Sequence, residues 1–242
     1  MIYLIISDVH SNWESLQKFI ELSQSIKHDK KVCLGDIVGY NADPNPCVEW
    51  IRDHVDIVLA GNHDYGVLEK IDISYFNLPA RAACLWTRTA LTKENREFLN
   101  SLTNAREQDG ITWVHASPFE PDEWHYVNNQ YDAEVNFPHF STPCCFLGHS
   151  HKPVILELRP DSKIEPIFDS IYSLKADCRY IVNVGSLGQP RDGNPDPAFA
   201  IFDSEACTVE IRRFSYDIAL TQEKIKSQGL PSILAERLDA GY

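Results

Sequence analysis

Five short segments of the sequence combine side chains that hold divalent metal ions. Carboxylate oxygens and imidazole nitrogens suit manganese, iron and zinc, and one carboxylate can bridge two ions. Two such ions about 4 Å apart polarise a phosphoryl group and lower the pKa of a bound water. These residue types predict metal-assisted hydrolysis, which needs no nucleophilic serine or cysteine. The segments are SDVH with Asp8 and His10, GDIVG with Asp36, GNHD with Asn62 and His63, WVHAS with His115, and GHSH with His149 and His151.

Glycine and residue spacing strengthen this interpretation. Gly35, Gly61 and Gly148 directly precede the first candidate ligand in three of the segments, and a residue without a Cβ lets the chain turn sharply or approach a ligand closely. Residues two apart in an extended segment point the same way, so Asp8 and His10 can bind one ion. Each motif alone is common by chance. Together, the five favour one shared site.

Each of these segments comes directly after a predicted strand. Apolar runs predict strands over 2–6, 31–34, 55–60, 111–115 and 144–147. Helical spacing predicts helices over 12–26, 46–54 and 78–102, with Thr92 capping a second helix in the last range. Ligands of α/β sheets bind beyond the carboxyl ends of strands. We therefore expect the five segments to converge.

The second half of the chain is richer in strands. Short apolar runs predict them over 144–147, 154–158, 180–184, 198–203 and 208–214, before closing helices over 217–227 and 232–238. A run of strands without intervening helices indicates a second sheet packed on the first. The predicted class is α/β, with residues 1–242 forming a single domain. Residues 119–140 lack periodicity and are expected to form a long loop or short-helix excursion.

Composition restricts the partners and the compartment. The 22 basic and 35 acidic residues give a net charge of −13, which argues against nucleic acid as a partner. No stretch approaches the roughly 20 apolar residues of a membrane span, and the N-terminal run has no basic leader. The seven cysteines are odd in number and lack CxxC spacing, as in reduced core cysteines of a cytoplasmic protein.

In this order and spacing, the five segments resemble those of the calcineurin-like metallophosphoesterase superfamily, from Met1 to about Phe214. The resemblance implies a four-layer α/β/β/α sandwich of two mixed sheets flanked by helices. It also implies two metal ions, divalent or of mixed valence, whose identity among Mn, Fe, Zn, Co and Ni the sequence does not fix. One ion would be held by Asp8, His10, Asp36 and His151. The other would be held by Asp36, Asn62, His115 and His149.

The resemblance also implies how the site works. Asp36 would bridge the ions, and a metal-bridging hydroxide would attack phosphorus in line with the departing oxygen. His63 would bind the phosphoryl group and assist the leaving oxygen by charge stabilisation or proton donation. The alternative for His63 is a structural role beside the ligands. Asn62, His63 and Arg191 are the residues expected to contact substrate.

Two further segments bear on the substrate. Residues 35–47 and 183–200 resemble a bacterial and archaeal subgroup related to diadenosine tetraphosphatases and small phosphodiesterases. The substrate is thus expected to be a small phosphodiester, phosphomonoester or dinucleoside polyphosphate. Arg191 either binds a second phosphate or pairs with a nearby aspartate to fix its loop. Asn183 and Ser186 are candidates for orienting metal ligands.

Two alternatives stay open. The aromatic residues of the 119–140 segment either stack a nucleobase or pack an irregular loop onto the body, and the second interpretation is the simpler. The whole chain is either a phosphoesterase or a catalytically silent metal-binding scaffold of the same fold. The complete ligand set and the histidine of GNHD favour the enzyme.

Overall fold

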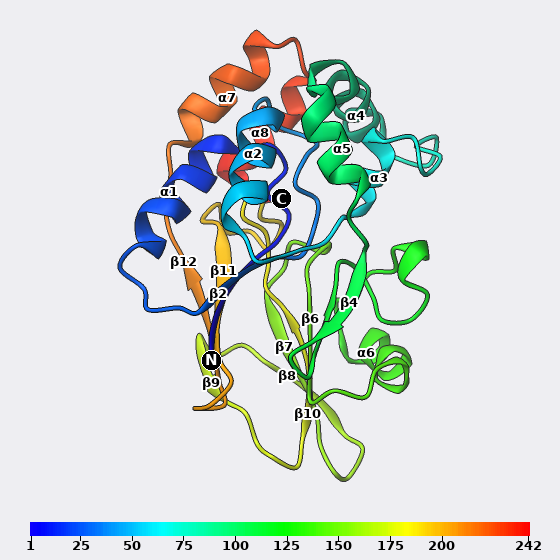
Figure 1. The fold of residues 1–242 in the computed structure, drawn as a ribbon, viewed down its shortest axis with the longest axis vertical. Helices are drawn as coiled ribbons and strands as arrows, with labels where there is room; N and C mark the ends of the chain where they lie inside the picture. The colour runs from blue at the N-terminus through cyan, green and yellow to red at the C-terminus, as the bar shows by residue number, and fades with distance from the viewer.

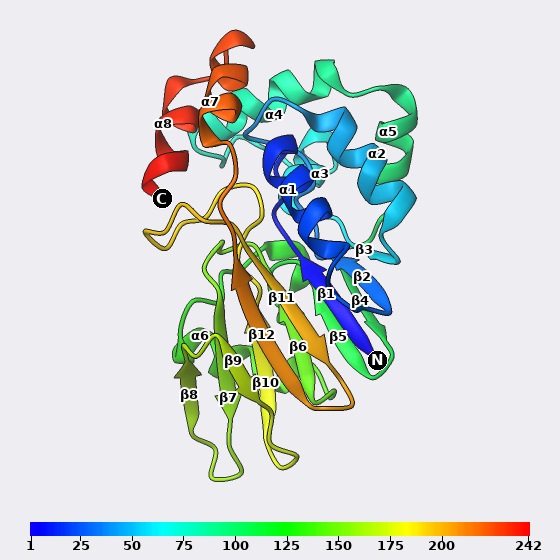
Figure 2. The same cartoon turned by 90° about the vertical axis from the view of Figure 1, so that its left-hand side faces the viewer.

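The computed structural model describes residues 1–242, which form two mixed six-stranded sheets packed face to face (Figure 1 and Figure 2). Sheet A has the order β3-β2-β1-β11-β12-β9, and sheet B has the order β4-β5-β6-β10-β7-β8. The strands are β1 (Ile2–Ile6), β2 (Lys30–Cys33), β3 (Ile57–Val58), β4 (Ala105–Gln108), β5 (Ile111–Val114), β6 (Cys144–Leu147), β7 (Val154–Leu158), β8 (Ile164–Ile167), β9 (Ile171–Ser173), β10 (Arg179–Asn183), β11 (Ala198–Asp203) and β12 (Thr208–Arg213).

Most of the helices gather over one end and one face of this sandwich (Figure 1). Thr92 begins α5 as predicted, because its hydroxyl accepts a hydrogen bond from the amide of Asn95 at 3.3 Å. None of the helices has the length and apolarity needed to cross a membrane. They are α1 (Trp13–Ser23), α2 (Pro44–His54), α3 (Asn62–Val67), α4 (Leu78–Ala90), α5 (Lys93–Asn100), α6 (Gln130–Asn136), α7 (Ile218–Ser227) and α8 (Ser232–Ala240), with 3₁₀ turns η1 (Pro121–Glu123) and η2 (Phe137–His139).

Parallel pairing aligns the strand ends that carry the candidate ligands. In sheet A, β1, β2 and β3 are parallel, so their carboxyl ends meet at one edge. In sheet B, β5, β6 and β10 are also parallel. Figure 2 shows the loops that leave both sets of strands at the same end of the sandwich, beneath the helices. This arrangement brings together segments that are far apart in the sequence.

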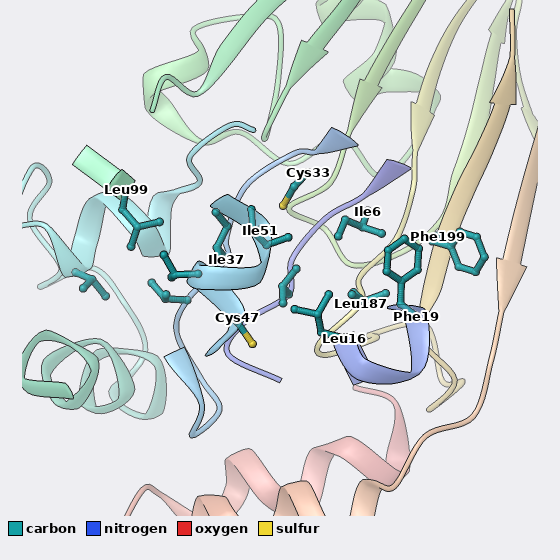
Figure 3. Close-up of a cluster of buried hydrophobic side chains, with 14 of the residues drawn as sticks. Ile6, Leu16, Phe19, Cys33, Ile37, Cys47, Ile51, Leu99, Leu187 and Phe199 are labelled. Atoms are coloured by element: carbon teal, nitrogen blue, oxygen red, sulfur yellow. The ribbon is translucent and has the colours of Figure 1, made fainter. Parts of the chain in front are cut away.

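Three apolar layers hold the structure together. The first lies between the sheets, where Tyr3 of β1 contacts Trp113 of β5. The second lies between sheet A and helices α1 and α2, where Phe19 packs against Phe199 (Figure 3). The third lies between sheet B and α6 with η2, around Phe137. These layers confirm the α/β/β/α sandwich, although the helical layer over sheet B is thin.

The predicted second sheet is present, and strands from both halves of the chain contribute to each sheet. Strands β11 and β12 come from the second half of the chain, but they pair with β1 and extend sheet A. Strands β4 and β5 come from the first half and belong to sheet B. Each sheet therefore combines strands from both halves of the chain. Antiparallel pairing of β1 with β11 connects the two halves, and such long-range pairing leaves no local sequence pattern.

Three strands and one helix were not predicted. Strands β4, β8 and β9 lie at or next to sheet edges and are short and partly exposed, so they lack a run of apolar residues. Helix α3 begins inside the GNHD segment, whose polar residues lack the apolar spacing that predicts a helix. The 119–140 segment contains α6 and two 3₁₀ turns, as expected for a short-helix excursion.

Candidate metal centre

The loops after β1, β2, β3, β5 and β6 bring the seven predicted ligands to one buried site. Each of these residues is at most 8% exposed. Their ligand atoms form two groups that share Asp36, and within each group these atoms lie within 4.8 Å of one another. The first group is Asp8, His10, Asp36 and His151, and the second is Asp36, His115 and His149. Asn62 is also buried, and its Oδ1 atom has no hydrogen-bond partner.

Backbone carbonyls orient three of the imidazole rings. A carbonyl oxygen only accepts, so the Nδ1 atom that faces it carries the proton and the Nε2 atom is free to bind a metal. The Nε2 atoms of these rings lie within 4 Å of the Asp8 or Asp36 carboxylate. The pairs are His10 with Val38 at 3.1 Å, His115 with Leu34 at 2.8 Å, and His151 with Gln189 at 2.5 Å.

His149 has the opposite orientation. Its Nε2 atom donates to the carbonyl oxygen of Trp124 at 2.9 Å, which leaves Nδ1 as its free acceptor. Trp124 has a left-handed backbone with φ of 58°, and it lies in the segment that the sequence left without a clear role. Sequence reasoning missed this contact because it is made by the main chain.

The first group brings acceptor atoms together in a way that fits a cation. The Nε2 atoms of His10 and His151 are 3.0 Å apart, and Asp8 Oδ1 lies 3.2 Å from the Nε2 atom of His151. With both Nδ1 atoms protonated, all three face one another as acceptors. Buried acceptors without donors cost free energy. A bound cation removes that cost, so these residues fit the metal that the sequence implies.

The charges of the site are those that a metal centre needs. Burial favours the neutral acid for both Asp8 and Asp36, but the surrounding histidines outweigh it and hold the pKa of each carboxyl below its usual range. Burial lowers the pKa of His10 and His151, and it lowers that of His149 to about 3. At neutral pH these two carboxylates and three imidazoles therefore already lack the proton that would compete with a metal ion.

His115 differs from the other rings. Burial opposes its protonation, but the adjacent Asp36 carboxylate outweighs burial and raises the pKa of His115 to about 9. The Nε2 atom of His115 lies 3.5 Å from Asp36 Oδ2. In the metal-free protein the Nε2 atom of this ring therefore carries a second proton at neutral pH, and metal binding must displace it.

The backbone is strained where it presents the ligands. Five of the seven predicted ligands have a left-handed backbone, a conformation that side chains other than glycine rarely adopt. Such strain is typical of functional sites and persists only where surrounding contacts impose it. Its concentration here supports a functional role. The residues and φ values are Asp8 at 54°, His10 at 48°, Asp36 at 49°, His149 at 63° and His151 at 61°.

At two of the glycines, the missing Cβ lets neighbouring ligand loops approach closely. Neither of these glycines has a positive φ. A Cβ on Gly61 would overlap the Asp36 carboxylate, and one on Gly148 would overlap Ser7 and the Asp8 carboxylate. These glycines let the ligand loops pack directly against each other. Asp8 Oδ2 then accepts a hydrogen bond from the amide of His149 at 2.9 Å.

Several polar residues hold the ligand loops in place. Ser186 donates to the carbonyl of Asp8 at 2.9 Å, and Asn183 donates to the carbonyl of Gly148 at 2.6 Å. Asp64 accepts from the amides of Gly61 and Val38 at 2.9 and 3.1 Å. Burial, with the charge of Asp36, raises the pKa of Asp64 to about 7. Asp64 was missed, although it completes the GNHD segment.

His63 lies beside both groups and belongs to neither. Its ring centre is 4.9 Å from that of His10 and 4.4 Å from that of Tyr40. Its amide donates to Asp36 at 2.8 Å. Burial first, aided by the positive charge of Arg191, lowers the pKa of His63 to about 4. His63 is thus a neutral imidazole at neutral pH.

Arg191 lies at the rim of the same site. Its amide donates to the carbonyl of His151 at 3.3 Å, and its Nε and Nη2 atoms donate to the side-chain oxygen of Gln189 at 3.2 and 2.9 Å. No carboxylate forms an ion pair with Arg191. The neighbouring Asp192 instead forms an ion pair with Arg213. The predicted alternative, a loop fixed by an arginine–aspartate pair, is wrong for Arg191.

The aromatic residues of the 119–140 segment serve two purposes. Phe119 stacks on His125 and packs the segment against itself. Tyr126 instead lies on the ring of His149, with ring centres 4.2 Å apart and planes 17° apart, and is half exposed. Part of the segment is therefore packing, as the simpler interpretation held, and part of it borders the candidate site.

Comparison with known proteins identifies relatives of the chain. A sequence profile of the calcineurin-like phosphoesterase superfamily domain matches residues 1–206. An uncharacterised protein of Methanocaldococcus jannaschii is 40% identical over 242 residues, which cover 98% of this chain and 97% of the relative. A metallophosphoesterase structure from Sphaerobacter thermophilus is 40% identical with a TM-score of 0.87, over 100% of this chain and 99% of that chain.

A more distant structure shares the fold. A hypothetical protein from Pyrococcus horikoshii is 20% identical with a TM-score of 0.80, and the match covers 100% of this chain and 98% of that chain. Helices α7 and α8 lie beyond the residues that the family profile matches, but both solved structures align over the full chain. The C-terminal helices therefore belong to the fold that this chain shares with these two structures.

Proposed function

Because the chain belongs to the calcineurin-like phosphoesterase superfamily, we propose that it hydrolyses a phosphate ester or anhydride at a two-metal centre. The observation that carries this proposal is the pair of buried histidine and aspartate groups that share Asp36. In the first group, the acceptor atoms of His10, His151 and Asp8 face one another without donors, which is costly unless a cation binds there.

The residues assigned to each ion follow from the family resemblance and agree with the grouping of ligand atoms. Asp36 belongs to both groups and is the proposed bridge. Asn62 is added to the second group because its side-chain oxygen is buried and unpartnered. The first ion is assigned to Asp8, His10, Asp36 and His151, and the second to Asp36, Asn62, His115 and His149. Metal identity is open, because such nitrogen and oxygen sites accept several transition metals.

The remaining polar groups act on the substrate. Two bound ions would supply Lewis-acid charge to the phosphoryl group and an activated water at neutral pH. His63, being neutral, offers a ring N–H as a hydrogen-bond donor to a phosphoryl oxygen. This charge state favours stabilisation of developing negative charge over proton donation in the free protein. Arg191 would add a positive charge at the rim.

The proposed substrate is small, and the proposed compartment is the cytoplasm. The net charge of −13 would repel a long polyanion. All seven cysteines are unpaired and six of them are buried, which supports a reducing compartment. The loop segments around Tyr40 and Arg191 support a phosphodiester, phosphomonoester or dinucleoside polyphosphate as substrate.

A substrate panel tests the proposal against a silent scaffold. Protein loaded with Mn²⁺ is assayed with bis-para-nitrophenyl phosphate, para-nitrophenyl phosphate and diadenosine tetraphosphate. Asp36→Asn should lower kcat by more than about 100-fold, beyond the effect of losing an outer partner of a metal ligand. His63→Ala should lower it about 100-fold. Asp177→Asn, on an exposed turn, is the matched control. Equal and negligible turnover by all four proteins would establish the scaffold.

A further inference from the structure

Two guanidinium groups from distant parts of the chain lie near one aromatic ring beside the candidate metal centre. Arg191 follows β10, and Arg237 lies on α8. Their Cζ atoms are 5.4 and 6.0 Å from the centre of the Tyr40 ring. That ring is buried and lies 4.4 Å from the ring of His63 and 4.6 Å from that of His10. One aromatic ring therefore connects both cations to the site.

The positive charge of this pair is not balanced by acidic side chains. Side-chain carboxylates lie within 4.0 Å of five of the eleven arginines of the chain, and Arg191 and Arg237 are among the six that have no such partner. Arg191 donates to the neutral amide of Gln189. Arg237 donates to the main-chain oxygen of Tyr242, the last residue. Even a terminal carboxylate there would balance only one of the two charges.

The two cations also act on each other. Burial first, and then the charge of Arg191, lowers the pKa of Arg237. In a chain with 35 acidic and 22 basic residues, two adjacent arginines without an acidic side chain are unfavourable in isolation. A bound anion relieves this repulsion. Guanidinium groups bind phosphate oxygens through paired hydrogen bonds, which makes phosphate the best-matched anion.

Helix α8 is fixed so that Arg237 stays at this place. Leu234 and Leu238, on the same helix, pack in one apolar cluster with Tyr40. At the end of the helix, the carbonyl of Gly241 accepts from the amide of Gly193 at 2.8 Å, so α8 is bound to the loop that carries Arg191. Figure 2 shows the C-terminus beside this loop. The family profile ends at residue 206, so Arg237 lies outside it.

We propose that Arg191 and Arg237 form a cationic subsite that binds a second phosphate group of the substrate, beside the phosphate that is hydrolysed. This inference rests on the proposed function and narrows it. Among the proposed substrates, it selects those with more than one phosphate, such as a dinucleoside polyphosphate. Esters with a single phosphate would leave the subsite empty.

Direct binding tests the subsite independently of catalysis. Tripolyphosphate is titrated into EDTA-treated protein by calorimetry, for the wild type, Arg237→Gln and Arg237→Lys. Arg106→Gln is the matched control, because it removes the same charge from the exposed strand β4. Arg237→Gln should weaken binding about tenfold, as expected for one lost charged hydrogen bond. Arg237→Lys should recover part of that loss, and Arg106→Gln should bind as the wild type does.

Three outcomes would overturn the subsite. One is equal tripolyphosphate binding by Arg237→Gln and the wild type. Another is an equal loss in Arg106→Gln, which would indicate a general charge effect. The third is tighter binding of the tricarboxylate tricarballylate than of tripolyphosphate, which would indicate a carboxylate site. Circular dichroism and Tm check that Arg237→Gln folds.

Kinetics connect the subsite to the substrate. In Mn²⁺-loaded protein, Arg237→Gln should lower kcat/KM for diadenosine tetraphosphate about tenfold, mainly through KM, and should lower kcat/KM for bis-para-nitrophenyl phosphate much less. An equal loss on both substrates would contradict the subsite. If no protein hydrolyses anything, the proposed function fails, while the calorimetric result still decides whether the two arginines bind phosphate.

Discussion

The imidazole rings of the candidate centre are held by the backbone before any metal binds. Carbonyl oxygens fix which nitrogen of His10, His149 and His151 carries the proton, and burial keeps these three rings neutral. Only His115 must lose a proton, because Asp36 raises its pKa to about 9. Among the predicted ligands, His115 is therefore the one whose protonation should make metal loading depend on pH.

We predict that the apparent affinity for Mn²⁺ rises with pH up to about pH 9. Below this pKa the proton on His115 competes with the metal, so one displaced proton gives roughly a tenfold change per pH unit. Calorimetry under nitrogen between pH 6 and 8.5 measures this slope. Repeating the titration in buffers with different ionisation enthalpies should reveal release of about one proton. A flat affinity across this range would contradict the assignment.

Gly39 limits the position of the proposed phosphate-binding histidine. It has φ of 101°, and a Cβ there would lie 2.7 Å from His63 Nδ1. We expect Gly39→Ala to displace His63 and lower kcat about 100-fold, because misplacing a catalytic group by about 1 Å costs that much. Mn²⁺ content, measured by mass spectrometry, should stay at the wild-type value.

A second glycine provides the control for Gly39. Gly110 also has a positive φ, of 71°, but nothing lies within 4 Å of an added Cβ. Gly110→Ala introduces backbone strain of about 1–2 kcal/mol without contacting the site, so its kcat should match the wild type. Equal activity of the two alanine variants would show that His63 is not positioned through Gly39.

At the scale of elements, a buried carboxylate joins the two sheets far from the metal centre. Glu157 of β7 is fully buried and accepts from Tyr172 of β9 and Tyr180 of β10 at 2.6 and 2.9 Å. Arg159 and Lys175 each approach it at 2.9 Å. Burial opposes ionisation, but these donors outweigh it and lower the pKa of Glu157 to about 2.

We predict that Glu157→Gln lowers the free energy of unfolding by about 2 kcal/mol at pH 7, since breaking a buried charged network leaves donors unpaired. The depressed pKa means that this contribution is complete above the unfolded-state value of about 4.3 and is lost as pH falls towards 2. Urea unfolding at pH 7 and pH 3 measures both differences. A difference that grows on acidification would contradict this account.

The elements differ in how far the sequence predicts them. Buried strands such as β1 and β6 are continuous apolar runs, and α5 begins at the predicted cap Thr92. Strand β4 has the sequence AREQ, which contains no apolar run. It is a strand because it pairs with β5. Pairing of β1 with β11 joins segments that are far apart in the sequence, with Ile2 opposite Asp203. Such contacts depend on the tertiary structure and leave no local pattern.

In the candidate site too, some residues could be predicted from the sequence and others could not. Its aspartates and histidines were predictable because they follow buried strands in recognisable motifs. The carbonyl of Trp124 and the amide contacts of Asp64 were not, because main-chain geometry creates them. Arg237 was also missed. Its helix is predicted by apolar spacing, but only the docking of α8 on Tyr40 brings this arginine to the site.

For the molecule as a whole, the sandwich is a scaffold that carries all its chemistry at one end. The parallel strands of both sheets end there, and α8 closes over the same end (Figure 2). The chain carries a net charge of −13, yet the rim of this end has two arginines that no acidic side chain balances. The overall charge disfavours long polyanions, while the local charge favours a small anionic substrate.

Titration of metal-free protein with Mn²⁺ tests the central claim most directly. Turnover of bis-para-nitrophenyl phosphate and bound metal are measured together after each addition. A two-metal phosphoesterase should be inactive after EDTA treatment, bind two ions per chain, and reach full turnover only as the second ion binds. Asp36→Asn should bind fewer ions and stay inactive. Full turnover without metal, or two bound ions without turnover on any phosphate ester or anhydride, would contradict the claim.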